Sequence, residues 1–411
     1  MANKPKLLVL TSTFPRWQND TDPPFVYELS RRLTENFSVT VLAPHYPGAR
    51  RHENLEGMEV YRYRYFSEKF EKLAGSSGIL PTLRKHKLYL LVIPFFLLAQ
   101  LISLVRLCFR SQPDIIHAHW LIPQGFMAGL SKLFTGIPFI VTAHGADVFG
   151  LNGWLPKRFK TFSLAKAARI TVVSRALYQT LTTDQLHDKL SIIPMGVDSK
   201  RFSPARQPKD TNRGRENRPK LLFVGRFSEK KGVSYLLQAM PHILKEFPLA
   251  KLCLVGGGEL GKNLKKQAEE LQIEDNVEFC GAIPNSELPD YYVAADIFIG
   301  PSIHATGGDT EGFGLTFVEA SLSGCLVIGT DVGGIGDIIK NGETGFLIPE
   351  KDSPAIAEKV IYALRHREEM QTIRKNATRY CQENFDWRVI SHKYSDLLNE
   401  VTTGTHTEKE L

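Results

Sequence analysis

The chain has 411 residues, of which 43% are hydrophobic and 23% are charged. This is the balance of a soluble globular protein with two or three domains. Its five cysteines are widely scattered and form no CxxC pair, which argues against a disulfide framework or a zinc site and fits a reducing cytosol. The net charge of +7 is uneven, because residues 1–200 carry 25 Lys and Arg against 14 Asp and Glu, a net +11. We therefore expect an anionic partner, either phosphate groups or an acidic membrane surface; without a nucleic-acid-binding signature, nucleic acid is not expected.

Short apolar segments alternate with longer helical patterns, which predicts an α/β fold with parallel sheets. In the first half, strands are expected at residues 6–10, 39–43, 58–64, 115–117, 139–142, 170–173 and 191–193. In the second half, they are expected at residues 221–224, 251–255, 277–280, 297–300, 326–329 and 345–348. The stretch between the two groups is polar and basic without apolar periodicity, so it reads as a linker.

These patterns predict two Rossmann-like doubly wound domains, with the cleft between them as the default ligand site. The first domain is expected at residues 1–200, the linker at 201–219 and the second domain at 220–384. Residues 402–411 form a polar tail that we expect to be frayed.

Residues 88–108 form a long apolar segment, and the basic residues 84–87 precede it. The segment is long enough to span a bilayer, but Pro94, Gln100 and Arg106 argue against a span. We favour a largely buried crossover helix. The alternative is an interfacial helix whose basic flank meets anionic lipid.

Histidines follow two strands of the first domain. His117 and His119 share one face of a strand and could bind a metal, but no third ligand has a suitable spacing, so no metal site is predicted. His144 lies just past the next strand, where it is expected to enter the cleft and to donate to a hydroxyl or polarise an attacking group. A packed core histidine is the alternative.

The second domain opens with a strand, Gly225 and the cations Arg226 and Lys231 before a helix. Together they form a candidate clamp for a diphosphate, with ordinary surface charges as the alternative. The GxGxxG match at residues 256–261 is a weak dinucleotide signal, because it lies in the second strand–helix unit of its domain.

The most informative stretch is the Gly-rich loop at residues 307–314, between a buried strand and a helix that we expect Thr316 to cap. Amides at such a helix start face an anion, and carboxylates at Glu311 and Glu319 accept hydrogen bonds from vicinal hydroxyls. A loop that can bind both a phosphate and the hydroxyls of a sugar or ribose predicts a nucleotide-sugar site. A Gly-rich turn without a ligand is common in α/β proteins and remains the alternative.

Taken together and in this order, the motifs resemble the retaining glycosyltransferases of family four (glycosyl transferases group 1), which have the GT-B fold. The residues that carry the resemblance are 114–120, 144–147, 193–198, 224–226, 231–232 and 311–320. It departs from the family at Asp22-Pro23-Pro24-Phe25, where many members have a Gly-Gly pair, and at residues 333–337, where proline and glutamate are usual.

The resemblance implies roles for individual residues. The catalytic residues would be His144 and Glu311, which contact the transferred sugar. The donor-binding residues would be Arg226 and Lys231 on the diphosphate, Glu319 on the ribose, Ile283 in the base-binding turn, and Gly312, Phe313, Gly314 and Leu315. Residues 385–401 would form a helix that crosses back from the donor-binding second domain to the acceptor-side first domain.

The resemblance therefore implies a retaining, hexosyltransferase-like enzyme that uses a UDP- or GDP-sugar, without a metal or other cofactor. We expect it to act in polysaccharide or glycoconjugate biosynthesis on a glycan or lipid-linked acceptor. We expect it in the cytoplasm, with peripheral contact on the cytoplasmic face of an anionic membrane. Two alternatives stay open: a nucleotide-sugar epimerase of the same fold, and an inactive nucleotide-sugar-binding module.

Overall fold

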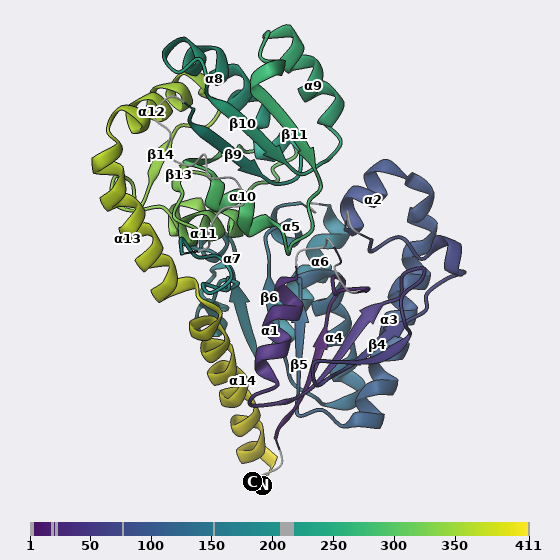
Figure 1. Ribbon diagram of the computed structural model, residues 1–411. Helices are drawn as coiled ribbons and strands as arrows, with labels where there is room; N and C mark the ends of the chain where they lie inside the picture. Colours follow the sequence, from purple (N-terminus) through teal and green to yellow (C-terminus); the bar gives the residue numbers. More distant parts are fainter. Residues whose placement is uncertain are drawn as a thin grey trace. The chain divides into compact units, whose positions relative to one another are not determined.

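The computed structural model describes residues 4–17, 20, 24–75, 78–150, 153–205 and 218–409. It divides into two compact units, each described here by itself. Unit 1 comprises Met1–Val173, Leu177–Met195 and Ile390–Leu411, and unit 2 comprises Ser174–Ala176 and Gly196–Val389. Each unit has a largely parallel sheet with helices around it (Figure 1). The predicted pair of α/β domains is confirmed.

The N-terminal part of unit 1 extends to Met195, whereas the first domain was predicted to extend to residue 200. The reason is that the amide of Val197 donates to the carbonyl of Phe385, and the amide of Trp387 donates back to the carbonyl of Val197. Residues 206–217 of the predicted linker lie outside the described residues, as do Asp22 and Pro23 of the first loop.

The last helix, α14 (Trp387–Lys409), passes from unit 2 into unit 1 at Ile390. It is longer than predicted, because it continues through most of the predicted frayed tail; residues 410 and 411 lie outside the described part. In unit 1 the buried Tyr394 anchors it. The Tyr394 hydroxyl donates to the carbonyl of Ile193 at 3.1 Å, and its ring lies 5.3 Å from that of His117 on the sheet.

The unit 1 sheet has the order β3-β4-β2-β1-β5-β6-β7-β8, and its strands are parallel except for the antiparallel pair β3–β4. The strands are β1 Lys6–Leu10, β2 Ser38–Pro44, β3 His52–Leu55, β4 Met58–Tyr63, β5 Ile115–His119, β6 Phe139–Ala143, β7 Arg169–Val172 and β8 Leu190–Ile192. The predicted strands appear within two residues of their expected ends. The edge strand β3 was not predicted, because its half-exposed sequence HENL has no apolar pattern.

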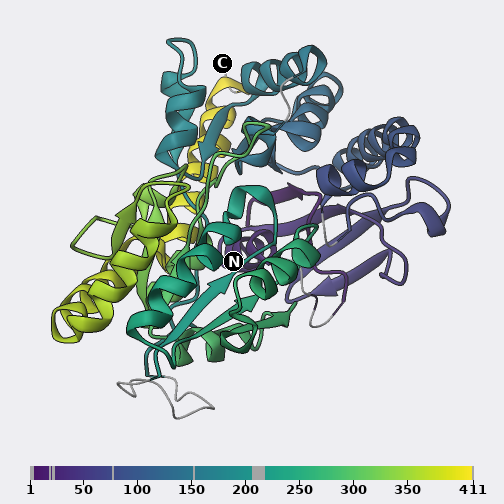
Figure 2. The same ribbon diagram turned by 90° about the horizontal axis from the view of Figure 1, so that it is seen from above.

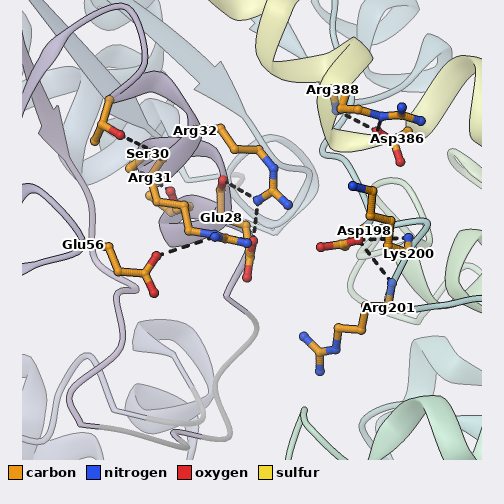
Figure 3. Close-up of polar contacts among 12 residues, drawn as sticks. Glu28, Ser30, Arg31, Arg32, Glu56, Asp198, Lys200, Arg201, Asp386 and Arg388 are labelled. Atoms are coloured by element: carbon orange, nitrogen blue, oxygen red, sulfur yellow. Dashed lines mark hydrogen bonds and ion pairs between the residues drawn. The ribbon is translucent and has the colours of Figure 1, made fainter.

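Besides α14, the α-helices that lie wholly or mostly in unit 1 are α1 Phe25–Leu33, α2 Ile79–Lys85, α3 Ile93–Ser111, α4 Phe126–Thr135, α5 Ala146–Phe149, α6 Trp154–Lys166 and α7 Arg175–Leu181, whose first two residues belong to unit 2. On α1, Glu28 pairs with Arg31 at 2.8 Å and also with Arg32, and Arg31 reaches Glu56 at 3.5 Å (Figure 3). These ion pairs link α1 to the turn between β3 and β4.

The long apolar segment forms a short 3₁₀ helix, η2 (Lys87–Val92), followed by α3. By length and composition alone, Lys87–Ser111 could cross a membrane, but only 22% of its apolar window is buried. The favoured prediction of a largely buried helix is wrong. Both views place α3 beside β4 (Figures 1 and 2), so one face, including Phe96 and Leu104, packs inward while the opposite face stays exposed.

The parallel unit 2 sheet has the order β11-β10-β9-β12-β13-β14, the Rossmann order 3-2-1-4-5-6. Its strands are β9 Lys220–Val224, β10 Lys251–Val255, β11 Val277–Gly281, β12 Ile297–Gly300, β13 Leu326–Thr330 and β14 Phe346–Ile348. Its α-helices are α8 Val233–Glu246, α9 Gly261–Glu270, α10 Leu288–Ala294, α11 Leu315–Leu322, α12 Ser353–Arg365 and α13 Arg367–Phe385. One apolar core joins α8, α9 and α12 to the sheet.

Candidate functional site

The predicted donor loop joins β12 to α11 in unit 2. Gly314, with φ of 101°, precedes the first helical residue Leu315. The predicted cap at Thr316 is therefore wrong, because Thr316 already lies within the helix. A side chain is disfavoured at such a positive φ, so a glycine permits the turn that starts α11. Gly312 and Phe313, which precede it, are buried.

Glu311 carries a paired negative charge in this loop. The Nζ of Lys231 donates to its carboxylate, and the two side chains are only 17% and 13% exposed. Burial by itself raises the pKa of Glu311, but Lys231, Lys230 and the Gly312 amide outweigh it, and the pKa is lowered. The carboxylate is therefore ionised. Lys230 is itself held at 3.1 Å by Asp309.

Glu319 differs from Glu311 because it has no cation in direct contact among the residues that the structure describes. Its carboxylate accepts a 2.7 Å hydrogen bond from the hydroxyl of the buried Tyr292. Burial raises the pKa of Glu319 to about 7, against the smaller lowering effects of Tyr292 and Arg201. Glu319 thus changes charge near neutral pH, whereas Glu311 stays ionised.

The Arg226 loop follows β9 and lies against the GxGxxG stretch. A Cβ at Gly256 would be 2.0 Å from the carbonyl oxygen of Gly225, and one at Gly258 would be 2.5 Å from that of Phe227. The Phe227 amide also donates to the Gly257 carbonyl at 2.8 Å. These glycines therefore allow two loops to pack backbone against backbone. Arg226 itself is exposed and has no polar partner within the described ranges.

A second close approach fixes the Glu311 loop. A Cβ at Gly333 would be 1.9 Å from the carbonyl oxygen of Glu311, and the amide of Gly334 donates to the same oxygen at 3.2 Å. Gly333 and Gly334, in the stretch where the chain departs from the family that it resembles, thus support the backbone of the loop that carries Glu311.

Sequence reasoning missed Arg201, which falls in the predicted linker. Its guanidinium donates to the carbonyl of Asn285, in the turn after β11 that also contains the partly buried Ile283. Asp198 shapes the approach by accepting the backbone amides of Lys200 at 3.0 Å and Arg201 at 3.2 Å (Figure 3). The signal was available, because Arg201 lies only three residues after the end of the motif at residues 193–198.

Arg201 also connects this turn to Glu319. The guanidinium lies 5.2 Å from the ring of Phe202, whose ring is 5.8 Å from that of Tyr292. Tyr292 in turn donates to Glu319. A single chain of contacts therefore supports both the turn with Ile283 and the carboxylate of Glu319.

In unit 1 three histidines lie together at the ends of β5 and β6. Nδ1 of His119 is 3.1 Å from Nε2 of His144, and Nε2 of His117 is 2.7 Å from the hydroxyl of Thr142. Sequence spacing gave no third ligand to accompany His117 and His119. The structure shows that the third histidine of this cluster is His144. Because His119 and His144 bond to each other, those two nitrogens face one another rather than a common point.

His144 is surrounded by aromatic rings, with centroids 4.8 Å from Trp120 and 5.0 Å from Phe25. Its backbone amide donates to the buried Asp147 at 3.1 Å. Burial first, and then the nearby His117, lowers the pKa of His144 to about 3. Its imidazole is therefore neutral, suited to hydrogen bonding rather than to acting as a cation.

Two family models match the chain. "Glycosyltransferase Family 4" matches residues 24–201, and "Glycosyl transferases group 1" matches residues 206–380. The chain belongs to the group 1 glycosyltransferases. This confirms the family that the order of motifs indicated.

Among curated proteins, the GDP-mannose-dependent alpha-(1-6)-phosphatidylinositol monomannoside mannosyltransferase of Mycolicibacterium smegmatis is 30% identical over 214 residues. The match covers 51% of this chain and 56% of that protein, so it spans only about half the length of the relative.

Among solved structures, sucrose-phosphate synthase from Thermosynechococcus elongatus superposes with a TM-score of 0.78 at 20% identity, covering 98% of this chain and 100% of that one. HepE from Anabaena, solved with UDP, gives 0.71 at 19%, covering 96% and 100%. These similarities establish the predicted GT-B fold.

We expect the thermal midpoint to fall as the pH drops below about 6.5, because burial lowers the pKa of His117 from 6.5 to about 3. A depressed native pKa stabilises the fold fully above the unfolded pKa. That stability is lost at about 1.4 kcal/mol per pH unit as the pH falls toward the native value. Thermal unfolding between about pH 7.5 and 5 should show a smaller loss in His117→Gln than in the wild type.

The matched control is His86→Gln, because His86 is an exposed histidine in the same unit. This variant should follow the wild-type pH dependence. If His117→Gln is as sensitive to pH as the wild type, the buried histidine does not carry the effect.

Proposed function

We propose that this chain is a retaining hexosyltransferase that transfers a sugar from a UDP- or GDP-sugar to a glycan or lipid-linked acceptor, without a metal. The observation that carries the proposal is the Lys231–Glu311 pair beside the start of α11, together with Glu319 on α11 itself. It combines a cation for phosphate with two carboxylates for hydroxyls. The mannosyltransferase relative and UDP-bound HepE support a nucleotide-sugar donor.

In the ligand-free protein, Glu311 neutralises Lys231. A bound donor exchanges these partners: its diphosphate takes the ammonium of Lys231, and the hydroxyls of its sugar donate to the freed carboxylate. Arg226 is exposed, and its guanidinium binds the same phosphates in this proposal. Gly312, Phe313, Gly314 and Leu315 provide backbone close to the sugar, and Ile283 packs on the base.

In the transfer step, the bond between the sugar C1 and the diphosphate oxygen breaks, and the nucleoside diphosphate leaves with the electron pair. The acceptor oxygen bonds to C1 from the same face, and its proton passes to the leaving phosphate oxygen. Arg226, Lys231 and the amides at the start of α11 stabilise the developing negative charge. The neutral imidazole of His144 holds a hydroxyl of the transferred sugar.

The exposed face of α3 supports an acceptor at a membrane. Leu88, Leu91, Phe95, Leu98 and Ile102 recur every three or four residues and are between 40% and 80% exposed, so they form a continuous apolar stripe. Other exposed apolar residues of unit 1 include Phe66, Phe70, Phe109, Leu133 and Phe134. The ring of Phe66 lies 5.3 Å from that of Phe95, which extends the stripe.

Exposed cations accompany the apolar stripe, namely Lys85, Lys87, Arg106 and Arg110. An apolar face with basic residues beside it binds the interface of an anionic bilayer. We propose that the enzyme acts in the cytoplasm, and the apolar and basic surface supports a peripheral attachment to the cytoplasmic face of the membrane. The name of the mannosyltransferase relative includes a phosphatidylinositol-linked acceptor. This is a lipid-linked acceptor, the class proposed here.

The donor is tested by thermal shift against UDP-, GDP-, ADP- and dTDP-sugars, with NAD as the control. A ligand that binds only the folded state raises the thermal midpoint, so one nucleotide family should stabilise the protein.

Glu311→Gln should lower transfer roughly 100-fold or more, and Glu358→Gln, at an exposed position on α12, should leave it unchanged. Near-normal turnover in both Glu311→Gln and Glu319→Gln would refute the donor site. Epimerised sugar formed without acceptor, or binding without any turnover, would favour the two alternative functions.

Arg201→Gln should raise the donor KM about tenfold with a smaller change in kcat, since losing a hydrogen bond from a charged group costs about 1.5–3 kcal/mol. The physical reason is that Arg201 supports the Asn285 turn and Glu319 without supplying a group to the reacting atoms. Steady-state kinetics measure both constants. Lys200→Gln is the control, because Lys200 is its exposed neighbour, and an equal effect in both variants would argue against a specific role.

The wild type should co-float with anionic vesicles at low salt and less with neutral ones. Leu91→Glu combined with Phe95→Glu should reduce binding at least a hundredfold, because two exposed anchors contribute about 3 kcal/mol or more. Leu249→Glu is the control, since Leu249 is 47% exposed and lies in unit 2, away from the stripe. If the wild type does not float at low salt, the membrane assignment fails.

A further inference from the structure

Two cysteines and a glutamate converge at the edge of the unit 2 sheet, outside the proposed donor site. Cys253 lies on β10, and Glu278 and Cys280 lie on the edge strand β11. One ligand atom from each, two thiol sulfurs and a carboxylate oxygen, lie within 4.8 Å of one another. Neither cysteine is in a disulfide.

Strand register explains how these residues meet. Cys253 is directly opposite Glu278 in the β10–β11 pair. The next pairs are Leu254 with Phe279 and Val255 with Gly281, so Cys280 is an extra residue at a bulge. A bulge redirects a side chain, and this one brings the thiol of Cys280 toward Cys253. The backbone register therefore places the three residues side by side.

The cluster lies on the sheet face opposite the core that joins α8, α9 and α12. The neighbours of Cys253 along β10, Leu252 and Leu254, belong to that core, as does Val277 on β11. Cys253 and Cys280 are partly buried, and Glu278 is exposed. An ion can therefore reach the thiols from solvent.

We propose that Cys253, Glu278 and Cys280 form a binding site for a thiophilic divalent cation of the Zn²⁺ class. Tetrahedral zinc with Zn–S bonds of about 2.3 Å separates two sulfurs by about 3.8 Å. The observed spread of at most 4.8 Å thus needs only a small side-chain adjustment. Two sulfurs and one carboxylate select zinc or cadmium over magnesium or calcium, and water completes the fourth position.

Metal binding requires both thiols to lose their protons. A thiolate is the form that binds a metal. As each sulfur–metal bond forms, the thiol proton that remains passes to solvent, so binding tightens as the pH rises. The site does not depend on the proposed transfer activity.

The test uses the full chain, stripped of metal and kept reduced without added thiol, and titrated with Cd²⁺. Binding of one Cd²⁺ per chain with a sulfur-to-cadmium charge-transfer band is expected. Cys253→Ser and Cys280→Ser should each weaken binding at least tenfold, and Glu278→Gln should weaken it less. Cys108→Ser is the control, because Cys108 is a buried cysteine in unit 1. An unchanged band in Cys253→Ser and Cys280→Ser would overturn the site.

A measurement on the wild type keeps the proposal testable if a variant fails to fold. Zn²⁺ should slow alkylation of Cys253 and Cys280 at least tenfold, as located by mass spectrometry of peptides, whereas Mg²⁺ should not. Equal alkylation rates with and without Zn²⁺ would overturn the proposal.

Discussion

The loop between β12 and α11 in unit 2 depends on keeping the largely buried Glu311 ionised. A carboxylate removed from water is unstable without a compensating charge or hydrogen bonds. Lys231 supplies the charge from a different strand–helix unit, and the Gly312 amide adds to it. The ion pair therefore ties the loop after β9 to the loop after β12. It also keeps in place the two charges that we propose a donor would separate.

Several glycines make this arrangement possible because the loops interlock through their backbones. Gly256 lies against Gly225, and Gly333 lies against Glu311, at distances that leave no room for a Cβ. Four strand ends, those of β9, β10, β12 and β13, thus form one rigid platform. Close packing between backbones accounts for Gly256, Gly258 and Gly333 without a ligand.

Unit 1 differs from unit 2 in its charges and in its exposed apolar surface. Burial lowers the pKa of His117, His119 and His144, and the net +11 of residues 1–200 resides in lysines and arginines, several of them exposed near α3. The apolar face of α3 is the largest departure from the expectation of a buried interior. Exposed leucines and phenylalanines at helical spacing are costly in water, and a membrane interface would remove that cost.

The sequence by itself determined the two parallel α/β units, most strand positions and the family, because these follow from local apolar patterns and from motifs in a fixed order. It could not reveal which face of α3 is buried, because the apolar pattern in the sequence is the same whether or not the rest of the protein covers those residues. Only the tertiary structure brought Arg201 to Asn285, 84 residues away, and Cys253 to Glu278 and Cys280. Contacts between distant residues depend on strand order, register and a bulge, and none of these leaves a periodic signal in the chain.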